Sequence, residues 1–281
     1  TWRRLAATTA RRRWATSGKR IIWVLKQEGH RLRGINAMVW GEVPLESGLS
    51  SSAALEVSVI MGLCALWDID LPALQMARLA QRAENEFVGV KCGLMDQFIS
   101  VFGRKDSALF LDCETLDYAY HPLNLERAGL GILVHDTKVR RKLASSEYNK
   151  RREEASRALE VLKAKGARSY KDATTALLQS AREMMEAVPY KRARHVITEN
   201  ARVRRAVEAL QKDDFGSLGA LLFQSHESLR DDYEVSCPEL DLLYDVGKGF
   251  PGCLGARLVG AGFGGSGIAL LEKRAGGEFR K

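Results

Sequence analysis

Residues 41–66 read GEVPLESGLSSSAALEVSVIMGLCAL, and the interpretation of the whole chain starts from this stretch. A loop of small residues, 47–52, leads into an apolar helix that we predict to begin near Ala53. The first backbone N–H groups of a helix have no partner within it, and the helix dipole adds partial positive charge there. Small side chains let an anion approach this backbone, and serine hydroxyls can ligate Mg²⁺ beside a phosphate. The pattern therefore predicts a phosphate site, although a serine run that only caps a buried helix fits these residues equally well.

Length and composition indicate an ordinary globular enzyme. The chain has 281 residues, 46% hydrophobic content and a mean hydropathy of −0.20, enough for one large or two modest domains. No apolar run is as long as a membrane span, so we expect no membrane partner. The five cysteines are scattered without metal-ligand spacing, which favours free thiols in a reducing, cytoplasmic compartment.

The positive charge of the chain is concentrated at its start. The formal net charge is +8, and residues 1–27 contain eight Lys or Arg and no acidic residue, so the remaining 35 basic and 35 acidic residues balance. A nucleic-acid-binding protein would be expected to carry an extended basic surface. We therefore expect no nucleic-acid partner.

Hydrophobic periodicity predicts an α+β chain. Strands are predicted at 31–43, 108–112, 118–123, 130–135, 256–259 and 266–271, the fourth of them buried. Helices are predicted at 14–28, from Ala53 to about 66, and at 74–88, 94–99, 147–165, 173–187, 190–211, 214–230 and 239–246. The composition changes after the fourth strand, and we place a domain boundary near residues 124–129.

Several motifs together resemble one enzyme family. The stretch Pro44-x3-Gly48-Leu49-Ser50-Ser51-Ser52-Ala53-Ala54 resembles the phosphate loop of the GHMP small-molecule kinases, and within them it is most similar to the galactokinases. Gly93-Leu94-Met95-Asp96-Gln97 resembles their catalytic segment, and Ser145-Ser146-Glu147-Tyr148-Asn149 their sugar-contacting segment. The loop Gly260–Gly265 is similar to their third, glycine-rich motif, with Ala261 as a mild departure.

The resemblance implies the two-domain GHMP kinase fold. A ribosomal S5-like, ATP-binding domain would cover residues 1–127, and a ferredoxin-like, helix-rich C-terminal domain residues 128–281. Galactokinases also carry an N-terminal signature, G-R-x-N-L-I-G-E-H-T-D-Y, that has no counterpart here. We therefore expect a chain that is truncated at both ends, with an incomplete first domain.

The resemblance also implies a role for individual residues. Asp96 would be the catalytic base, and Ser52 and Glu84 would hold Mg²⁺. The sugar would contact Gly93, Asp96 and Tyr148. The ATP phosphates would bind Gly48, Leu49, Ser50, Ser51, Ser52 and Ala53. The third-motif loop would place Gly260, Gly262, Gly264 and Gly265 beside the active site.

Each of these residues also has a structural interpretation. Asp96 could be a helix N-terminal acid and Glu84 part of a solvated helix face. Tyr148 could belong to a helix start, and the glycine loop could be a tight turn.

The implied activity is ATP- and Mg²⁺-dependent phosphorylation of the anomeric hydroxyl of D-galactose to galactose 1-phosphate, by a monomeric enzyme. Two alternatives remain open. The chain could be another GHMP sugar-1-kinase, or a catalytically silent regulator that binds galactose and ATP.

Overall fold

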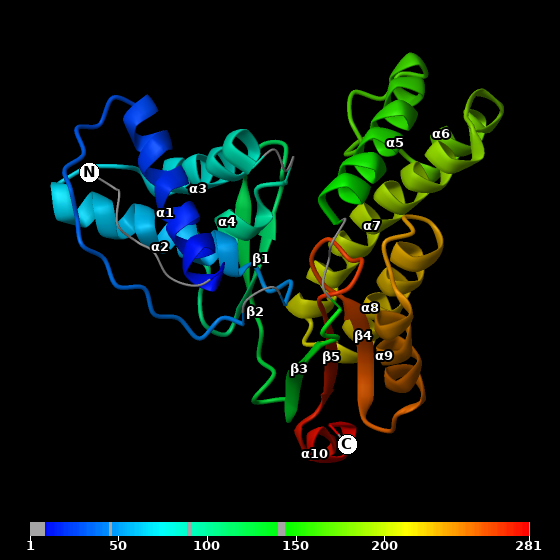
Figure 1. Cartoon of the computed structure of the whole chain (residues 1–281). Coiled ribbons are helices and arrows are strands. Elements are labelled where there is room, and N and C mark those ends of the chain that lie inside the picture. The colour runs from blue at the N-terminus through cyan, green and yellow to red at the C-terminus, as the bar shows by residue number, and fades with distance from the viewer. Residues whose placement is uncertain (1–8, 45–46, 89–91, 140–143, 281) are drawn as a thin grey trace. The chain divides into compact units, whose positions relative to one another are not determined.

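The apolar stripe predicted for residues 14–28 belongs to α1 (Thr9–Gln27) in the computed structural model of the chain (Figure 1). Ile21 lies one helical turn before Val24 and Leu25. All three are fully buried in the core that α1 forms with α2 (Ser51–Trp67) and α3 (Ala73–Arg82). Spacings of three and four residues place apolar side chains on one face of a helix. The helix predicted at this place is confirmed, with an earlier start.

The structure describes residues 9–44, 47–88, 92–139 and 144–280, with no account of the side chains of 9–16, Val88, Ala144 and Ser145. The described residues form two units. The first comprises residues 9–44, 50–88, 92–105 and 109–119, and the second residues 47–49, 106–108, 120–139 and 144–280. Within the described residues, no helix combines the length and apolarity that a bilayer crossing requires.

The first unit is mainly helical. Besides α1 to α3 it contains a turn of π-helix, η1 (Ala83–Val88), and α4 (Met95–Phe102). Phe98 of α4 is fully buried and stacks on Phe102, with Ala77 and Leu94 completing this part of the core. A two-stranded sheet of β1 (Ser107–Leu111) and β2 (Tyr118–Pro122) follows, and the division between the units falls within these strands.

The strand predicted at residues 31–43 is wrong. Residues 30–42 form neither helix nor strand, and the side chains of Met38 and Trp40 are 94% and 80% exposed. The apolar run at residues 37–40 is typical of a strand. A strand, however, also needs a neighbour for its backbone N–H and C=O groups, and the described residues provide none here.

The second unit is built on a three-stranded antiparallel sheet of order β3-β5-β4. β5 (Ser266–Glu272) lies at the centre, so that Asp136 of β3 pairs with Ser266, and Leu130 with Glu272. The other elements of this unit, in chain order, are β3 (Leu130–Asp136), α5 (Ala144–Ala164), α6 (Thr175–Ser180), the 3-10 turn η2 (Arg182–Met184), α7 (Ala187–Gln211), α8 (Phe215–Asp231), α9 (Pro238–Gly249), β4 (Cys253–Leu258), the 3-10 turn η3 (Lys273–Ala275) and α10 (Gly276–Phe279).

Most elements predicted for this unit are confirmed, with two corrections. The helix predicted at 173–187 is two pieces, α6 and η2, joined at Ala181. The strand predicted as buried, β3, is buried on one side only, because Ile132 and Val134 are each 47% exposed. β3 lies at an edge of the sheet, and only a strand covered on both faces is buried throughout.

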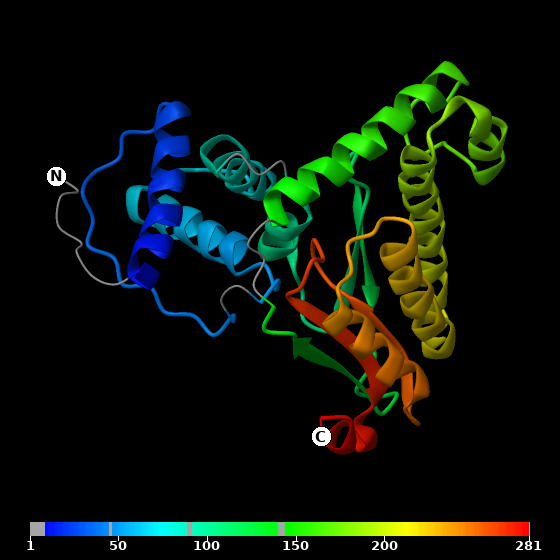
Figure 2. The ribbon, with the colours of Figure 1, turned by 45° about the vertical axis from the view of Figure 1, so that its right-hand side comes forward.

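The helices stack outward from β4. α8 and α9 pack on β4, α7 packs on α8, and α5 packs on α7 (Figure 2). Two glycines allow the close approach of α8 to the strand. A Cβ on Gly219 would lie 2.1 Å from the carbonyl oxygen of Leu254, and one on Gly255 would lie 2.2 Å from the carbonyl oxygen of Gly219. Both obstacles are backbone atoms, so a side chain at either position would push the helix off the sheet.

We therefore expect Gly219→Ala to destabilise the second unit. Alanine favours a helix over glycine by about 1 kcal/mol. Overpacking against backbone should outweigh this gain and leave a net loss of roughly 1–3 kcal/mol. Gly216→Ala, on the same helix, is the matched control, because its Cβ would make only an ordinary contact at 3.6 Å. Urea unfolding followed by circular dichroism compares the two, and equal stabilities would contradict the close-packing account.

Candidate functional site

Two residues just before α2 have left-handed backbone conformations. Gly48 has φ +80°, and Ser50, the N-cap residue, has φ +58°. Ser50 makes no side-chain capping hydrogen bond, although serine at this position usually makes one. A capping serine would have used its hydroxyl to satisfy the first-turn N–H groups. Ser51, Ser52 and Ala53, three of the residues predicted to bind the ATP phosphates, form the first turn.

Glu84 lies in the π-helical turn η1 and contacts Ser52 directly. The Ser52 hydroxyl donates a hydrogen bond to Oε1 of Glu84 and lies 3.4 Å from Oε1 of Glu56, a residue of α2. π-Helical turns within helices are frequent at functional sites because they redirect side chains. The two residues predicted to hold Mg²⁺ are thus brought together from positions 32 residues apart.

Two further residues, which the sequence did not single out, complete this cluster. Arg20 of α1 places Nη1 3.3 Å from Oε1 of Glu56 and 3.3 Å from Oε1 of Glu84. Glu56 is fully buried, and burial together with the neighbouring Glu84 carboxylate raises its pKa to about 9, against the opposing effect of Arg20. The only indication of this cluster in the sequence was Glu56, an acidic residue within the otherwise apolar α2.

Asp96 is the second residue of α4 and is half-buried. The described residues offer its carboxylate no hydrogen bond or ion pair, which leaves both oxygens able to accept from a ligand. Nearby Gly93 is not closely packed, since a Cβ on it would meet nothing within 4 Å. A cavity of about 400 Å³ elsewhere in the first unit includes none of the candidate residues; it is lined by Glu28, Pro72, Leu74, Gln75, Arg78, Leu79 and Arg82.

The second unit brings the beginning of the phosphate loop to the glycine-rich loop. Ser266, directly after Gly265, is fully buried and donates from Oγ to the carbonyl oxygen of Ser47 at 2.6 Å. Thr137, directly after β3, donates from N and Oγ1 to the carbonyl oxygen of Gly265 at 2.8 and 2.7 Å. Segments more than 120 residues apart in the sequence therefore meet at one end of the sheet.

The glycine-rich loop needs glycine at specific positions. Gly260, Gly262, Gly264 and Gly265 all have positive φ. A Cβ on Gly262 would lie 2.1 Å from the carbonyl oxygen of Val235, and one on Gly264 would lie 2.8 Å from that of Val139. Ala261 does not adopt a positive φ, so the departure from the galactokinase motif at this position costs no backbone strain.

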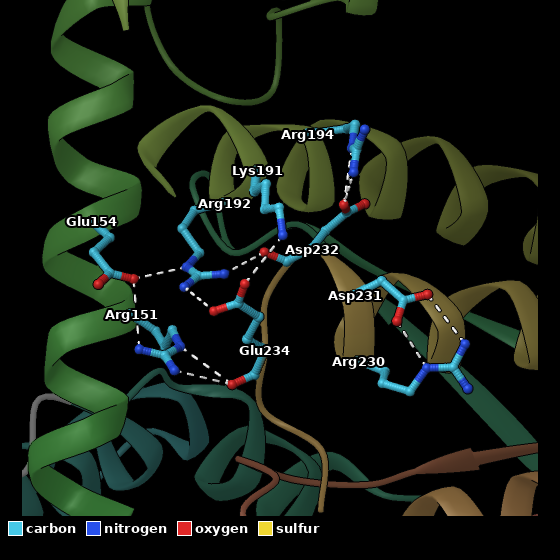
Figure 3. Close-up of polar contacts among 9 residues, drawn as sticks. All are labelled: Arg151, Glu154, Lys191, Arg192, Arg194, Arg230, Asp231, Asp232 and Glu234. Carbon is cyan, nitrogen blue, oxygen red and sulfur yellow. Dashed lines mark hydrogen bonds and ion pairs between the residues drawn. The ribbon is translucent and has the colours of Figure 1, made fainter. Parts of the chain in front are cut away.

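An ion-pair cluster joins α5 and α7 to residues 232–234, which precede the loop's contact residue Val235 (Figure 3). The buried guanidinium of Arg192 on α7 donates to Glu154 on α5 at 2.7 Å, to Glu234 at 2.8 Å and to the carbonyl oxygen of Asp232. Arg151, one turn after Tyr148 on α5, donates from Nε and Nη2 to the carbonyl oxygen of Glu234 at 3.3 and 3.2 Å.

The chain continues from Glu234 to Val235, whose carbonyl oxygen accepts a hydrogen bond from the N–H of Phe263 in the glycine-rich loop. The guanidinium of Arg151 also lies 5.8 Å from the centre of the Phe263 ring. Arg151 thus links α5, the helix that carries Tyr148, to the glycine-rich loop.

A second buried network links α7 and α8 to β4. Glu199 accepts from Ser225 at 2.6 Å and pairs with Arg257 at 3.4 Å. Burial alone would raise the pKa of Glu199, but Arg257 and the hydrogen bonds from Ser225 and Arg202 lower it. His226 accepts the N–H of Leu258 at Nδ1 and faces Asp241 through Nε2 at 3.1 Å.

Comparisons with known proteins agree with this arrangement of motifs. Residues 18–104 match the GHMP kinases N terminal domain, and residues 206–280 match GHMP kinases C terminal. A galactokinase of Thermotoga petrophila is 46% identical over 96% of this chain and 74% of its own length. The chain belongs to the galactokinase family of the GHMP kinases.

Other family members extend the comparison. A galactokinase of Thermococcus kodakarensis is 44% identical over 94% of this chain and 72% of its own length. The crystal structure of Lactococcus lactis galactokinase complexed with galactose superposes with a TM-score of 0.90 at 37% identity, over 95% of this chain and 69% of that chain. The expected GHMP kinase fold, with N- and C-terminal domains, is confirmed.

Arg192 offers a direct test of the cluster that supports the loop. Removal of one partner of a buried ion pair leaves the other charge uncompensated, which typically costs about 3–5 kcal/mol. We expect a loss of this size for Arg192→Met, because Glu154 is buried as well.

Arg205→Met is the matched control, since Arg205 is an exposed arginine of the same helix, α7. Substitution of an exposed residue usually changes stability by about 0.5 kcal/mol or less. Urea unfolding should separate the two variants, and similar losses would show that the buried cluster does not hold the unit.

Proposed function

We propose that this chain transfers the γ-phosphoryl group of MgATP to the anomeric hydroxyl of D-galactose and so produces galactose 1-phosphate. The observation that carries the proposal is the direct contact of Ser52 with Glu84 at the N-terminus of α2, beside first-turn N–H groups left without a side-chain cap. Membership of the galactokinase family supports the choice of sugar.

ATP would bind with its phosphates against the backbone of residues 48–53. Gly48 and Ser50 turn the chain so that the first-turn N–H groups of α2 face outward from its end. These groups and the helix dipole attract negative charge, which increases on the phosphates as the phosphoryl group transfers. Leu49 would contribute only backbone to this site.

The residues present fit a magnesium ion. Glu84 and Ser52 supply a carboxylate and a hydroxyl oxygen, the hard donors that Mg²⁺ takes, and the ion needs few protein ligands because it keeps several waters. When bound with ATP, Mg²⁺ would neutralise charge on the phosphates. Glu84 and Ser52 are the side chains we assign to its coordination.

Asp96 would act on the sugar hydroxyl. Its carboxylate oxygens would accept the hydrogen bond of the anomeric O–H and then its proton. The bond from this oxygen to the γ-phosphorus forms while the bond to the β–γ bridging oxygen breaks, and ADP leaves. Because phosphoryl transfer depends mainly on positioning and electrostatics, orientation of the hydroxyl is the main task of this residue.

The two units would divide the work. We assign ATP binding to residues 1–127 and the C-terminal domain to residues 128–281, in line with the family matches at 18–104 and 206–280. Gly93 would lie against the sugar, and Tyr148 would contact it from α5. The loop with Gly260, Gly262, Gly264 and Gly265 would support the beginning of the phosphate loop through Ser266. We further propose a monomeric, cytoplasmic enzyme, in line with its free cysteines.

The test is ADP release from MgATP with a panel of hexoses. We expect turnover with galactose, and Asp96→Asn should lower kcat by about 10²-fold or more because general base catalysis is lost. Asp70→Asn is the matched control, since Asp70 is an exposed carboxylate of the same unit outside the site. Turnover with a different hexose would favour another sugar-1-kinase. Binding of galactose and ATP without turnover would favour a silent regulator.

A further inference from the structure

Arg20 is the only arginine in the described part of the chain that contacts both Glu84, the proposed metal ligand, and the neighbouring Glu56. Its Nη1 is 3.3 Å from Glu84, the proposed ligand, and equally far from Glu56. Arg20 contacts Oε1 of each glutamate, and the Ser52 hydroxyl contacts the same two oxygens. A cationic nitrogen therefore lies beside the oxygen atoms that a metal ion would use.

Glu84 carries the negative charge of this cluster. Glu56 is fully buried, and its second oxygen, Oε2, has no hydrogen-bond partner among the described residues. A carboxyl group removed from water beside another carboxylate favours its protonated, uncharged form. Arg20, with a side chain only 15% exposed, is the cation that the fold itself supplies at this point.

Arg20 is also held in place by its surroundings. It projects from α1, whose Ile21, Val24 and Leu25 are buried in the core of the first unit. Its guanidinium lies 5.9 Å from the ring centre of Phe87, which follows Glu84 in the π-helical turn. A charge fixed in this way does not leave the carboxylates without cost when another cation arrives.

We propose that Arg20 is a built-in counter-ion that competes with the divalent metal for Glu84 and lowers the affinity of the nucleotide-free site for that metal. The inference rests on the proposed role of Glu84 and Ser52 in binding Mg²⁺. It concerns a residue of the basic N-terminal region, which the sequence explained only as a local excess of charge. In this account the site takes up its metal together with the ATP phosphates, which add the negative charge that Arg20 has cancelled.

The experiment is a titration of the full chain with Mn²⁺ in the absence of nucleotide, with free Mn²⁺ measured by electron paramagnetic resonance. Arg20→Gln keeps an amide that can hydrogen-bond to the carboxylates but removes the charge. Loss of a charge about 3 Å from the ligand oxygen should tighten Mn²⁺ binding by about tenfold or more. Arg20→Met removes the donors as well and should tighten binding similarly.

Three control variants make the result specific. Arg20→Lys keeps the charge and should stay within about threefold of the wild type. Arg78→Met removes one exposed charge from α3 in the same unit and should leave Mn²⁺ binding unchanged. Glu84→Gln, added to Arg20→Gln, should abolish the gain.

Folded Arg20→Gln or Arg20→Met protein with unchanged or weaker Mn²⁺ binding would overturn the proposal and leave Arg20 as a purely structural tie between α1, α2 and η1. The same would follow if the gain persisted without Glu84. Galactose-dependent ADP release by the wild type, measured on the same preparation, reports on the proposed function separately. The two hypotheses can therefore fail independently.

Discussion

The guanidinium of Arg192 joins three segments of the second unit that the backbone alone would not hold together. It reaches α5 through Glu154 and the connection between α8 and α9 through Glu234 and the carbonyl oxygen of Asp232, from its own position on α7. A buried arginine is stable only when its donors are paired, so these partners have to adopt one arrangement. The position of Val235, and through it the glycine-rich loop, follows from that arrangement.

The first unit repeats this principle on a smaller scale. Arg20 of α1 lies against Glu56 of α2 and Glu84 of η1. The difference is the completeness of pairing. Arg192 meets its acceptors in a satisfied cluster, whereas Arg20 leaves its own Nε and Oε2 of Glu56 without a partner in the described part of the chain. A satisfied cluster is suited to support, and an incompletely satisfied one is suited to exchange its cation, which fits the different roles we assign to the two units.

The fold was predicted through the resemblance of several motifs to one family, and most of its helices and strands were predicted from local sequence patterns. The small-residue loop before α2, the helix periodicity of α7 and α8, and the glycines of residues 260–265 are all legible without knowledge of distant partners. The strand predicted at 31–43 failed for the opposite reason. Its identity depends on a neighbouring strand, and a run of apolar residues contains no information about whether that neighbour exists.

The candidate site was predictable where a motif carries it and not where tertiary contacts create it. Ser52 and Glu84 could be paired only through resemblance, and the structure then brought them into contact. In the sequence, Glu56 is only an acidic residue within an apolar helix, and Gly219 is only a residue of low helix propensity. Their roles arise from what faces them, a second carboxylate in one case and the backbone of β4 in the other. Arg192 is likewise one of many arginines in α7 until burial singles it out.

The structure of the reaction product tests most directly whether this chain phosphorylates the anomeric oxygen of galactose. Phosphorus NMR of a reaction with galactose and MgATP, coupled to proton detection, identifies which sugar carbon carries the phosphate. We predict a phosphomonoester whose phosphorus couples to the anomeric proton. Coupling to the two protons on C6, or transfer of the phosphoryl group to water alone, would contradict it.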